Sequence, residues 1–144
     1  MDIASLKIHF DEKDRQWILN RIDESLQRGE LSQGRNVEEF ERRFEAYSGI
    51  RHAIAVNNGT SAIEIVMRIL DVKGKEVLLP TNTFLATATG VLFAGGSVRL
   101  LDVDPSTMSV SLDEIKRRVT QNTVGVIIVH IGGIITPGIE DIQQ

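Results

Sequence analysis

From residue 52 onward, short apolar runs alternate with segments in which apolar residues recur at helical spacing. The strand-like runs are 52–56, 77–79, 98–103 and 124–129. Runs that are apolar at consecutive positions are typical of strands buried on both faces, as in a parallel sheet. Strands that alternate with helices form βα units. The pattern therefore predicts an α/β fold with a mainly parallel sheet of four strands and flanking helices.

The first third of the chain carries only the helical pattern. Apolar residues lie on one helical face in 18–26 and again in 37–47. Gly29 and Gly49 follow these two stretches, and glycine commonly ends a helix at such a position. The sequence therefore predicts two helices, and we interpret their apolar stripes as core packing.

Composition and charge exclude several classes of protein. Of the 144 residues, 42% are apolar and 25% are charged, as in globular domains. The net charge is −4 and no basic run exceeds two residues, which argues against a nucleic-acid-binding surface. The chain has no cysteine, which excludes disulfides and thiolate metal sites. We expect a helical segment over 1–50 and the first part of an α/β domain over 51–144.

No segment has the pattern of a targeting or membrane sequence. Residues Met1 to Ser5 have no positive flank and begin no apolar stretch, unlike a signal peptide. The most apolar segment, 124–135, is shorter than the roughly 20 residues that span a bilayer. We therefore expect a cytoplasmic protein without a membrane partner.

The segment Asn57-Asn58-Gly59-Thr60-Ser61 joins the first apolar run to the next helical pattern. The first amides of a helix have no partner within it, so a phosphate can bind there. Gly59 would allow close backbone approach, and Thr60 and Ser61 offer hydroxyls. The alternative is an ordinary capped turn, because Ser61 and Glu64 have the spacing of a capping box. The segment is neither a Walker loop nor a GxGxxG motif.

Other chemically active side chains follow the predicted strands, at the edge where open α/β sheets bind ligands. Phe84 could stack on a planar heterocycle or pack in the core. Asp102 and Asp104 could hold a metal, although the proline after them favours a polar turn. We expect hydrogen bonds to satisfy a neutral His130. No other histidine is spaced from it as metal ligands are, so we expect no metal site.

Two further helix starts are visible in the second half of the chain. Ser111 and Glu114 have capping-box spacing. Thr136 followed by Pro137 is the signature of a cap and a first helical residue. The chain stops within that last helix, and four short strands would leave exposed sheet edges. We therefore expect a piece of a larger domain.

Several motifs occur in a fixed order along the chain. They are Leu31-Ser32-Gln33-Gly34, Val37-Glu38-Glu39-Phe40-Glu41, Asn58-Gly59-Thr60-Ser61-Ala62, Pro80-Thr81-Asn82-Thr83-Phe84-Leu85-Ala86-Thr87-Ala88, Asp102-Val103-Asp104-Pro105 and Val129-His130-Ile131-Gly132-Gly133. Their order and spacing resemble the sugar aminotransferases of the DegT/DnrJ/EryC1/StrS family. That family has the fold-type-I architecture of aspartate aminotransferase, so the α/β segment would be the incomplete large domain of a pyridoxal-phosphate (PLP) dependent transferase.

The resemblance implies PLP as the cofactor of the complete enzyme. The positions that would bind it are Gly59, Thr60, Ser61 and Phe84. The first three would hold the phosphate, and the phenyl ring would stack on the pyridine ring. A second loop would lie near the sugar substrate and the partner subunit of a homodimer, and it contains Leu31, Ser32 and Gly34.

The residues that carry out catalysis in relatives have no counterpart in this chain. The aspartate that pairs with the pyridinium nitrogen and the lysine that forms the Schiff base fall beyond Gln144. Asp141 lies in a similar Ile-Glu-Asp stretch, but it follows His130 too closely to take the aspartate's role. We therefore expect no catalytic residue here and no activity of the chain alone.

The resemblance implies that the complete enzyme transfers an amine from an amino donor, usually glutamate, to a nucleotide-linked keto-deoxysugar. Its product would enter cell-surface polysaccharides or glycosides. Two alternatives stay open. The complete protein could be a PLP-dependent sugar dehydratase of the same family, in which a histidine replaces the lysine. The chain could instead be a non-catalytic α/β binding module.

Overall fold

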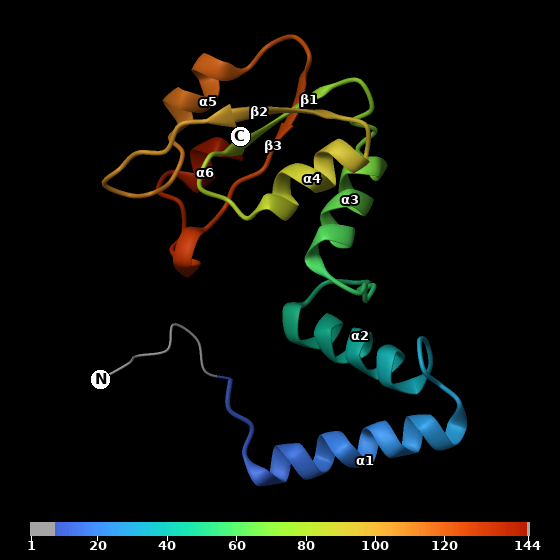
Figure 1. Cartoon of the computed structure of the whole chain (residues 1–144). Coiled ribbons are helices and arrows are strands. Elements are labelled where there is room, and N and C mark those ends of the chain that lie inside the picture. The colour runs from blue at the N-terminus through green and yellow to red at the C-terminus, as the bar shows by residue number, and fades with distance from the viewer. Residues whose placement is uncertain (1–7, 144) are drawn as a thin grey trace. The chain divides into compact units, whose positions relative to one another are not determined.

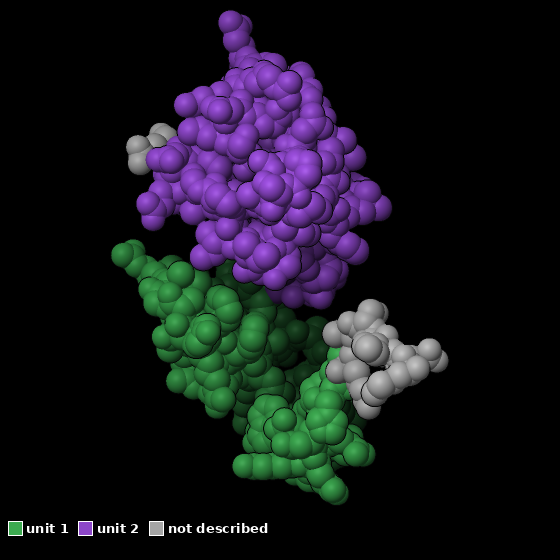
Figure 2. Space-filling view, turned by 90° about the vertical axis from the view of Figure 1, so that its left-hand side faces the viewer, with its two compact units in different colours: residues 1–55 green, residues 56–144 purple. Residues whose placement is uncertain are grey.

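The chain forms two compact units, Met1–Ala55 (unit 1) and Val56–Gln144 (unit 2), which Figure 2 shows in different colours. Within them the computed structural model describes residues 8–143. The segment Met1 to Ser5, in which we expect no signal peptide, lies outside the described residues. No helix within 8–143 is both long and apolar enough to cross a membrane.

Unit 1 contains two helices, α1 (Glu12–Arg28) and α2 (Arg35–Ser48). The carboxylate of Asp11 caps α1 by accepting a 2.7 Å hydrogen bond from the amide of Asp14. Gly29 and Gly49 end the two helices in left-handed conformations, with φ of 72° and 73°. Both predicted helices and both terminating glycines are thus confirmed.

The interpretation of the apolar stripes on these helices as core packing was wrong. Neither helix contains a buried residue. Phe40 is 59% exposed and Tyr47 is 89% exposed. Two helices form only one seam between them, and the described part of unit 1 has no further layer to cover the other apolar side chains.

Unit 2 alternates helices and strands (Figure 1). Its elements in chain order are α3 (Gly59–Ile69), β1 (Glu76–Pro80), α4 (Leu85–Phe93), β2 (Ser97–Leu101), α5 (Leu112–Arg118), β3 (Thr123–Val126), the 3₁₀ helix η1 (Ile131–Gly133) and α6 (Ile139–Ile142). The strands lie in the order β2-β1-β3, and β1 pairs in parallel with both neighbours. The predicted α/β class and parallel sheet are confirmed.

The sheet of unit 2 lies between two layers of helices. Along β1, Val77 and Leu79 pack into one cluster with side chains of α3 and α4, while Leu78 packs into a second cluster with Ile115 of α5. All three β1 side chains are at most 1% exposed. Figure 1 shows α5 on the opposite side of the sheet from α3 and α4. The continuous apolar run of β1 was thus a correct sign of a strand covered on both faces, whereas β2 and β3 leave Leu100 and Val124 exposed.

The predicted first strand, 52–56, is not a strand. Its backbone amides bind carboxylates of α2 instead of a neighbouring strand. The amide of Ala53 donates to Glu45 Oε1 at 2.9 Å, and the amide of Ala55 donates to Glu41 Oε1 at 2.7 Å. No strand within residues 8–143 pairs with this segment, so the sheet has three strands and not the expected four.

The last predicted helix begins two residues later than expected. The Thr136-Pro137 pair precedes Gly138, whose φ of 69° is left-handed and cannot continue a helix. The helix α6 therefore starts at Ile139. The start of α5 is as predicted, because the Ser111 hydroxyl accepts a 3.1 Å hydrogen bond from the amide of Glu114.

Candidate functional site

The start of α3 is capped by Asn58. Its side-chain oxygen accepts from the amide of Ser61 at 2.9 Å, and its backbone oxygen accepts from the amide of Ala62 at 3.3 Å. The capping box of Ser61 and Glu64 does not form, because Asn58 is the N-cap and Glu64 pairs with Arg68 at 2.7 Å, but the start of α3 is a capped turn. The amides of Gly59 and Thr60 donate to no group within the described residues.

The space beside Gly59 is open. A Cβ placed on Gly59 would meet no atom within 4 Å. The side chains of Thr60 and Ser61 are half-buried beside it. Since α3 is 11 residues long, its dipole adds partial positive charge at this end. Two free amides, two hydroxyls and an open approach fit a phosphate dianion.

Gly90 brings α4 into close contact with α3. A Cβ on Gly90 would lie 2.6 Å from Ile63 Cγ2 and 3.3 Å from the backbone nitrogen of Glu64. Because a helix rises about 1.5 Å per residue, Gly59 and Leu85 lie roughly 6 and 8 Å along their helices from this crossing. The starts of both helices therefore lie within two turns of the same contact, which the sequence reading missed.

Phe84 is the N-cap residue of α4 and presents its ring to solvent. The residue is 81% exposed, so the core-packing alternative was wrong. The segment before it is held to the sheet, because the amide of Thr81 donates to the backbone oxygen of Leu101 at 3.1 Å. An exposed ring on an anchored segment is suited to stacking on a planar ligand.

The aspartates after β2 form a polar turn, as the proline suggested. Asp102 pairs with Arg118 at 3.0 Å. Asp104 accepts hydrogen bonds from the hydroxyl and the amide of Ser106 at 2.6 and 2.7 Å, and these bonds lower the pKa of the Asp104 carboxyl. Within residues 8–143 no group of three or more acidic or histidine side chains could hold a metal ion.

A buried carboxylate joins α5 to the end of β2. Glu114 accepts hydrogen bonds from Arg117, from the amide of Asp102 at 3.2 Å and from Arg118 at 2.9 Å. The bond from the Arg117 guanidinium is the largest cause that lowers the pKa of Glu114, which falls to about 2 although burial opposes the shift. Glu114 is therefore ionised at neutral pH and belongs to the scaffold.

His130 follows β3 and has a defined tautomer. Its Nδ1 accepts a 3.0 Å hydrogen bond from the backbone amide of Thr136, whose hydroxyl lies 3.1 Å from the same nitrogen. A backbone amide can only donate, so Nδ1 carries no proton and the neutral ring carries it on Nε2. The expectation that hydrogen bonds satisfy this histidine is confirmed at Nδ1.

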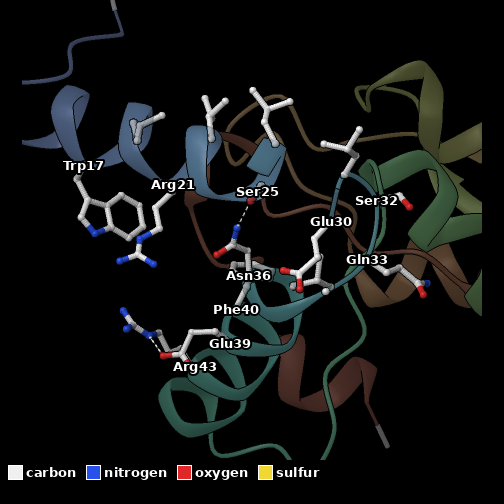
Figure 3. Close-up of a pocket in the computed structure, with 16 residues that line it drawn as sticks. Trp17, Arg21, Ser25, Glu30, Ser32, Gln33, Asn36, Glu39, Phe40 and Arg43 are labelled. Carbon is white, nitrogen blue, oxygen red and sulfur yellow. Dashed lines mark hydrogen bonds and ion pairs between the residues drawn. The ribbon is translucent and has the colours of Figure 1, made fainter. Parts of the chain in front are cut away.

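The predicted substrate loop lines a groove between α1 and α2 (Figure 3). The groove has a volume of about 800 Å³, with Trp17 at one end and Ser32 at the other. The Arg21 guanidinium lies 5.7 Å from the Trp17 ring centroid. At Gly34 a Cβ would lie 3.0 Å from the side chain of Glu30, and φ is 142°, so glycine is required there.

The structure places the predicted site residues in two groups. The predicted cofactor-binding positions all lie in unit 2, and they are Gly59, Thr60, Ser61 and Phe84. The predicted substrate-loop positions all lie in unit 1, and they are Leu31, Ser32 and Gly34. Each group lies at the end or the start of regular elements.

Known proteins of similar sequence include a transaminase and an aminotransferase of sugar substrates. The GDP-perosamine synthase of Caulobacter vibrioides is 33% identical over 124 residues, which are 85% of this chain and 33% of that protein. The 3-oxo-glucose-6-phosphate:glutamate aminotransferase of Bacillus subtilis is 36% identical over 117 residues, which are 81% of this chain and 26% of that protein. The chain thus spans about a third of the length of the relatives it matches.

Solved structures agree with the sequence matches. NtdA from Bacillus subtilis with bound cofactor PMP has a TM-score of 0.80 and 33% identity, over 85% of this chain and 28% of that chain. DesV of S. venezuelae in complex with a ketimine intermediate has a TM-score of 0.72 and 25% identity, over 88% of this chain and 35% of that chain. The fold of unit 2 is therefore part of a sugar-aminotransferase fold.

Residues 12–144, nearly the whole chain, match the sequence profile of one family. This match agrees with the motif order along the sequence and with the α/β architecture. The chain belongs to the DegT/DnrJ/EryC1/StrS aminotransferase family.

Proposed function

We propose that this chain is the N-terminal part of a PLP-dependent aminotransferase that acts on a nucleotide-linked keto-deoxysugar. The observation that carries the proposal is the open start of α3, where the amides of Gly59 and Thr60 have no partner within residues 8–143. Membership of the family, together with similar proteins whose structures are of the PLP form or hold PMP, supports PLP as the ligand of this proposed site.

Each proposed residue has one role in binding. The amides of Gly59 and Thr60 bind the phosphate of the cofactor, and the hydroxyls of Thr60 and Ser61 donate to its remaining oxygens. The ring of Phe84 stacks on the pyridine ring and fixes its plane. When bound, PLP supplies the electron sink for amine transfer, while the protein supplies binding and orientation.

The proposed substrate class follows from the relatives. They include a GDP-perosamine synthase, a dTDP-3-amino-3,6-dideoxy-alpha-D-galactopyranose transaminase and a spore coat polysaccharide biosynthesis protein. Two of these names contain a nucleotide-activated deoxysugar. We accordingly assign the complete protein a nucleotide-linked keto-deoxysugar as acceptor, an amino acid as donor and polysaccharide or glycoside biosynthesis as its context.

The proposed homodimer is supported by unit 1. Its helices expose apolar side chains along their length, which isolated soluble helices do not tolerate. The most exposed of them are Tyr47, Leu26, Trp17, Phe40 and Leu19. A second subunit seated on this surface would enclose the loop that contains Leu31 and Ser32, the proposed substrate loop.

The binding of pyridoxamine 5′-phosphate (PMP) tests the proposal. PMP is preferred as the probe because the aldehyde of PLP reacts with any lysine. The quenching of PMP fluorescence by the chain is titrated for the wild type, Thr60→Glu and Gln16→Glu. A glutamate at position 60 favours the helix but repels the phosphate. Gln16→Glu adds the same charge on exposed α1, in the other unit, and serves as the matched control.

We expect saturable binding by the wild type and by Gln16→Glu. In Thr60→Glu the dissociation constant should rise about tenfold or more, as expected for a charge placed beside a dianion. Circular dichroism should show that helix content is retained. A wild type that does not bind PMP, or a Thr60→Glu variant that binds it equally well, contradicts the proposed function.

A further inference from the structure

The segment that carries Phe84 is fixed to the rest of unit 2 by side-chain bonds as well as by the sheet. Asn82 Nδ2 donates to the backbone oxygen of Met108 at 2.8 Å. The hydroxyls of Thr83 and Thr87 lie 2.7 Å apart, and Thr87 is buried in α4. Two of the three residues before Phe84 are therefore held by their own side chains.

The partner of Asn82 belongs to a tight turn after β2. In this turn Asp104 and Ser109 form an antiparallel bridge, and the amide of Met108 donates to the backbone oxygen of Asp104 at 2.7 Å. Met108 has a φ of 56°, in the left-handed region that non-glycine residues rarely occupy. Such a conformation costs free energy and persists only where neighbouring groups hold it.

The bond between Asn82 and Met108 joins the ends of two neighbouring strands. Asn82 comes two residues after β1, and the turn at 104–109 follows β2, which pairs with β1 in parallel. The bond spans 26 positions of sequence and connects the aromatic segment to a turn with a strained residue. The strands of the sheet pair without the bond from Asn82 to Met108. The bond therefore acts by restricting the conformation of the segment between Pro80 and α4.

We propose that Asn82 is a positioning residue that holds Phe84 in place for stacking on the cofactor, with the turn at 104–109 as its anchor. This inference rests on the proposed function for its ligand. Phe84 is 81% exposed, so packing contacts of its own ring do not fix the segment. Without this bond the segment samples other conformations. Stacking of the ring then costs the conformational entropy of ordering the segment.

The variant Asn82→Asp tests the role of this bond. Aspartate has the shape of asparagine, but at neutral pH it cannot donate to the Met108 oxygen. The matched control is Asn122→Asp. Asn122 Nδ2 also donates to a backbone oxygen, that of Gly74, at 3.4 Å. Gly74 precedes β1 and Asn122 precedes β3, so this bond lies at the amino ends of the strands, whereas Asn82 lies at the carboxyl end of β1. Both variants add one negative charge to unit 2.

Two readouts on the 144-residue chain separate the local effect from the cofactor effect. Amide hydrogen exchange is measured at Thr81, Asp104 and Met108, and PMP affinity is measured by fluorescence. We expect Asn82→Asp to speed exchange at Met108 and to weaken PMP binding about two- to tenfold, the range expected for one hydrogen bond. Asn122→Asp should change neither quantity.

Unchanged exchange in Asn82→Asp overturns the proposal. Faster exchange with unaltered PMP affinity also overturns it, because Asn82 then only stabilises the turn. A wild type that does not bind PMP contradicts the proposed function itself, and with it the cofactor role of Asn82. If the wild type does not bind PMP, faster amide exchange in Asn82→Asp still shows that the bond from Asn82 to Met108 holds the segment.

Discussion

The carboxylate of Glu114 accepts a 3.2 Å hydrogen bond from the backbone amide of Asp102, and this bond ties α5 to the residue that follows β2. The same carboxylate binds Arg117 and Arg118 while only 8% of the residue is exposed. Buried charge is stable only when it is paired and hydrogen-bonded, as it is here. Glu114 therefore holds the backbone at Asp102, two residues before the turn at 104–109.

Glu114→Gln should remove a pH-dependent part of the stability. The pKa of Glu114 falls from 4.5 to about 2 on folding, so its contribution is complete above pH 4.5 and declines as the pH falls toward 2. We expect the variant to lose on the order of 2–3 kcal/mol at pH 7 in urea unfolding. The difference from wild type should narrow between pH 4.5 and 2. A free energy of unfolding that depends on pH equally in the variant and the wild type would refute this role. An equal loss of stability in Asp113→Asn, a variant of the exposed neighbouring residue, would also refute it.

Gly90→Ala should destabilise unit 2 despite the helix preference of alanine. The new Cβ would lie 2.6 Å from Ile63 Cγ2, on a β-branched side chain with little freedom to move. Overpacking costs about 1–3 kcal/mol, and alanine returns about 1 kcal/mol in a helix. We expect a net loss of up to about 2 kcal/mol in the free energy of unfolding. Gly125→Ala, where a Cβ meets nothing within 4 Å, is the control. A stabilised Gly90→Ala would show that α3 and α4 do not cross closely.

The contacts of α2 with the segment 52–56 predict a reciprocal pattern of hydrogen exchange. Glu41→Gln should speed exchange at Ala55, and Glu45→Gln should speed exchange at Ala53, because each carboxylate accepts from one of these amides. Charged acceptors form the stronger bonds, so the amide variants weaken them without changing shape. Each variant serves as the other's control. Equal exchange at both amides in both variants would mean that the segment is not held by α2.

In its neutral form His130 should carry its proton on Nε2. The amide of Thr136 donates to Nδ1 and therefore excludes the other tautomer. Nitrogen-15 shifts of the imidazole should show a single tautomer for His130. Thr136→Val, which removes the hydroxyl but keeps the backbone donor, should leave it unchanged. A neutral imidazole with its proton on Nδ1 in the wild type would contradict the structure at the end of β3.

Much of the fold could be predicted because it is encoded locally. The cap at Ser111, the glycines after α1 and α2, and the apolar runs of β1 to β3 each act within a few residues of sequence. A local signal is strong enough to fix a helix end or a buried strand. The class of the fold follows from their order.

The parts that were predicted wrongly depend on partners distant in sequence. The run 52–56 has the composition of a strand, but a strand needs a neighbour, and within residues 8–143 its amides find the carboxylates of α2. The stripe of Phe40 and Tyr47 has core periodicity, but no third layer covers it in the described part of unit 1. Periodicity identifies an apolar face, not what covers it.

The candidate site could be predicted only in outline. The proposed anion site after the first apolar run is predicted from a motif of five residues. The alternative interpretation assigned the helix cap to Ser61. Asn58 and Ser61 both have side chains that can cap a helix, and only the three-dimensional structure shows that Asn58 is the cap. The close approach at Gly90 and the bond from Asn82 to Met108 join residues 26 or more positions apart, and no local pattern signals them.

The binding of a phosphate at the start of α3 is tested most directly by nitrogen-15 chemical shifts during titration with PMP. We predict saturable shifts that are largest at the amides of Gly59, Thr60 and Ser61, with smaller ring-current shifts near Phe84. Inorganic phosphate should shift the amides of Gly59, Thr60 and Ser61 without causing the ring-current shifts near Phe84. Shifts confined to other parts of the chain, or none at millimolar PMP, would contradict the account.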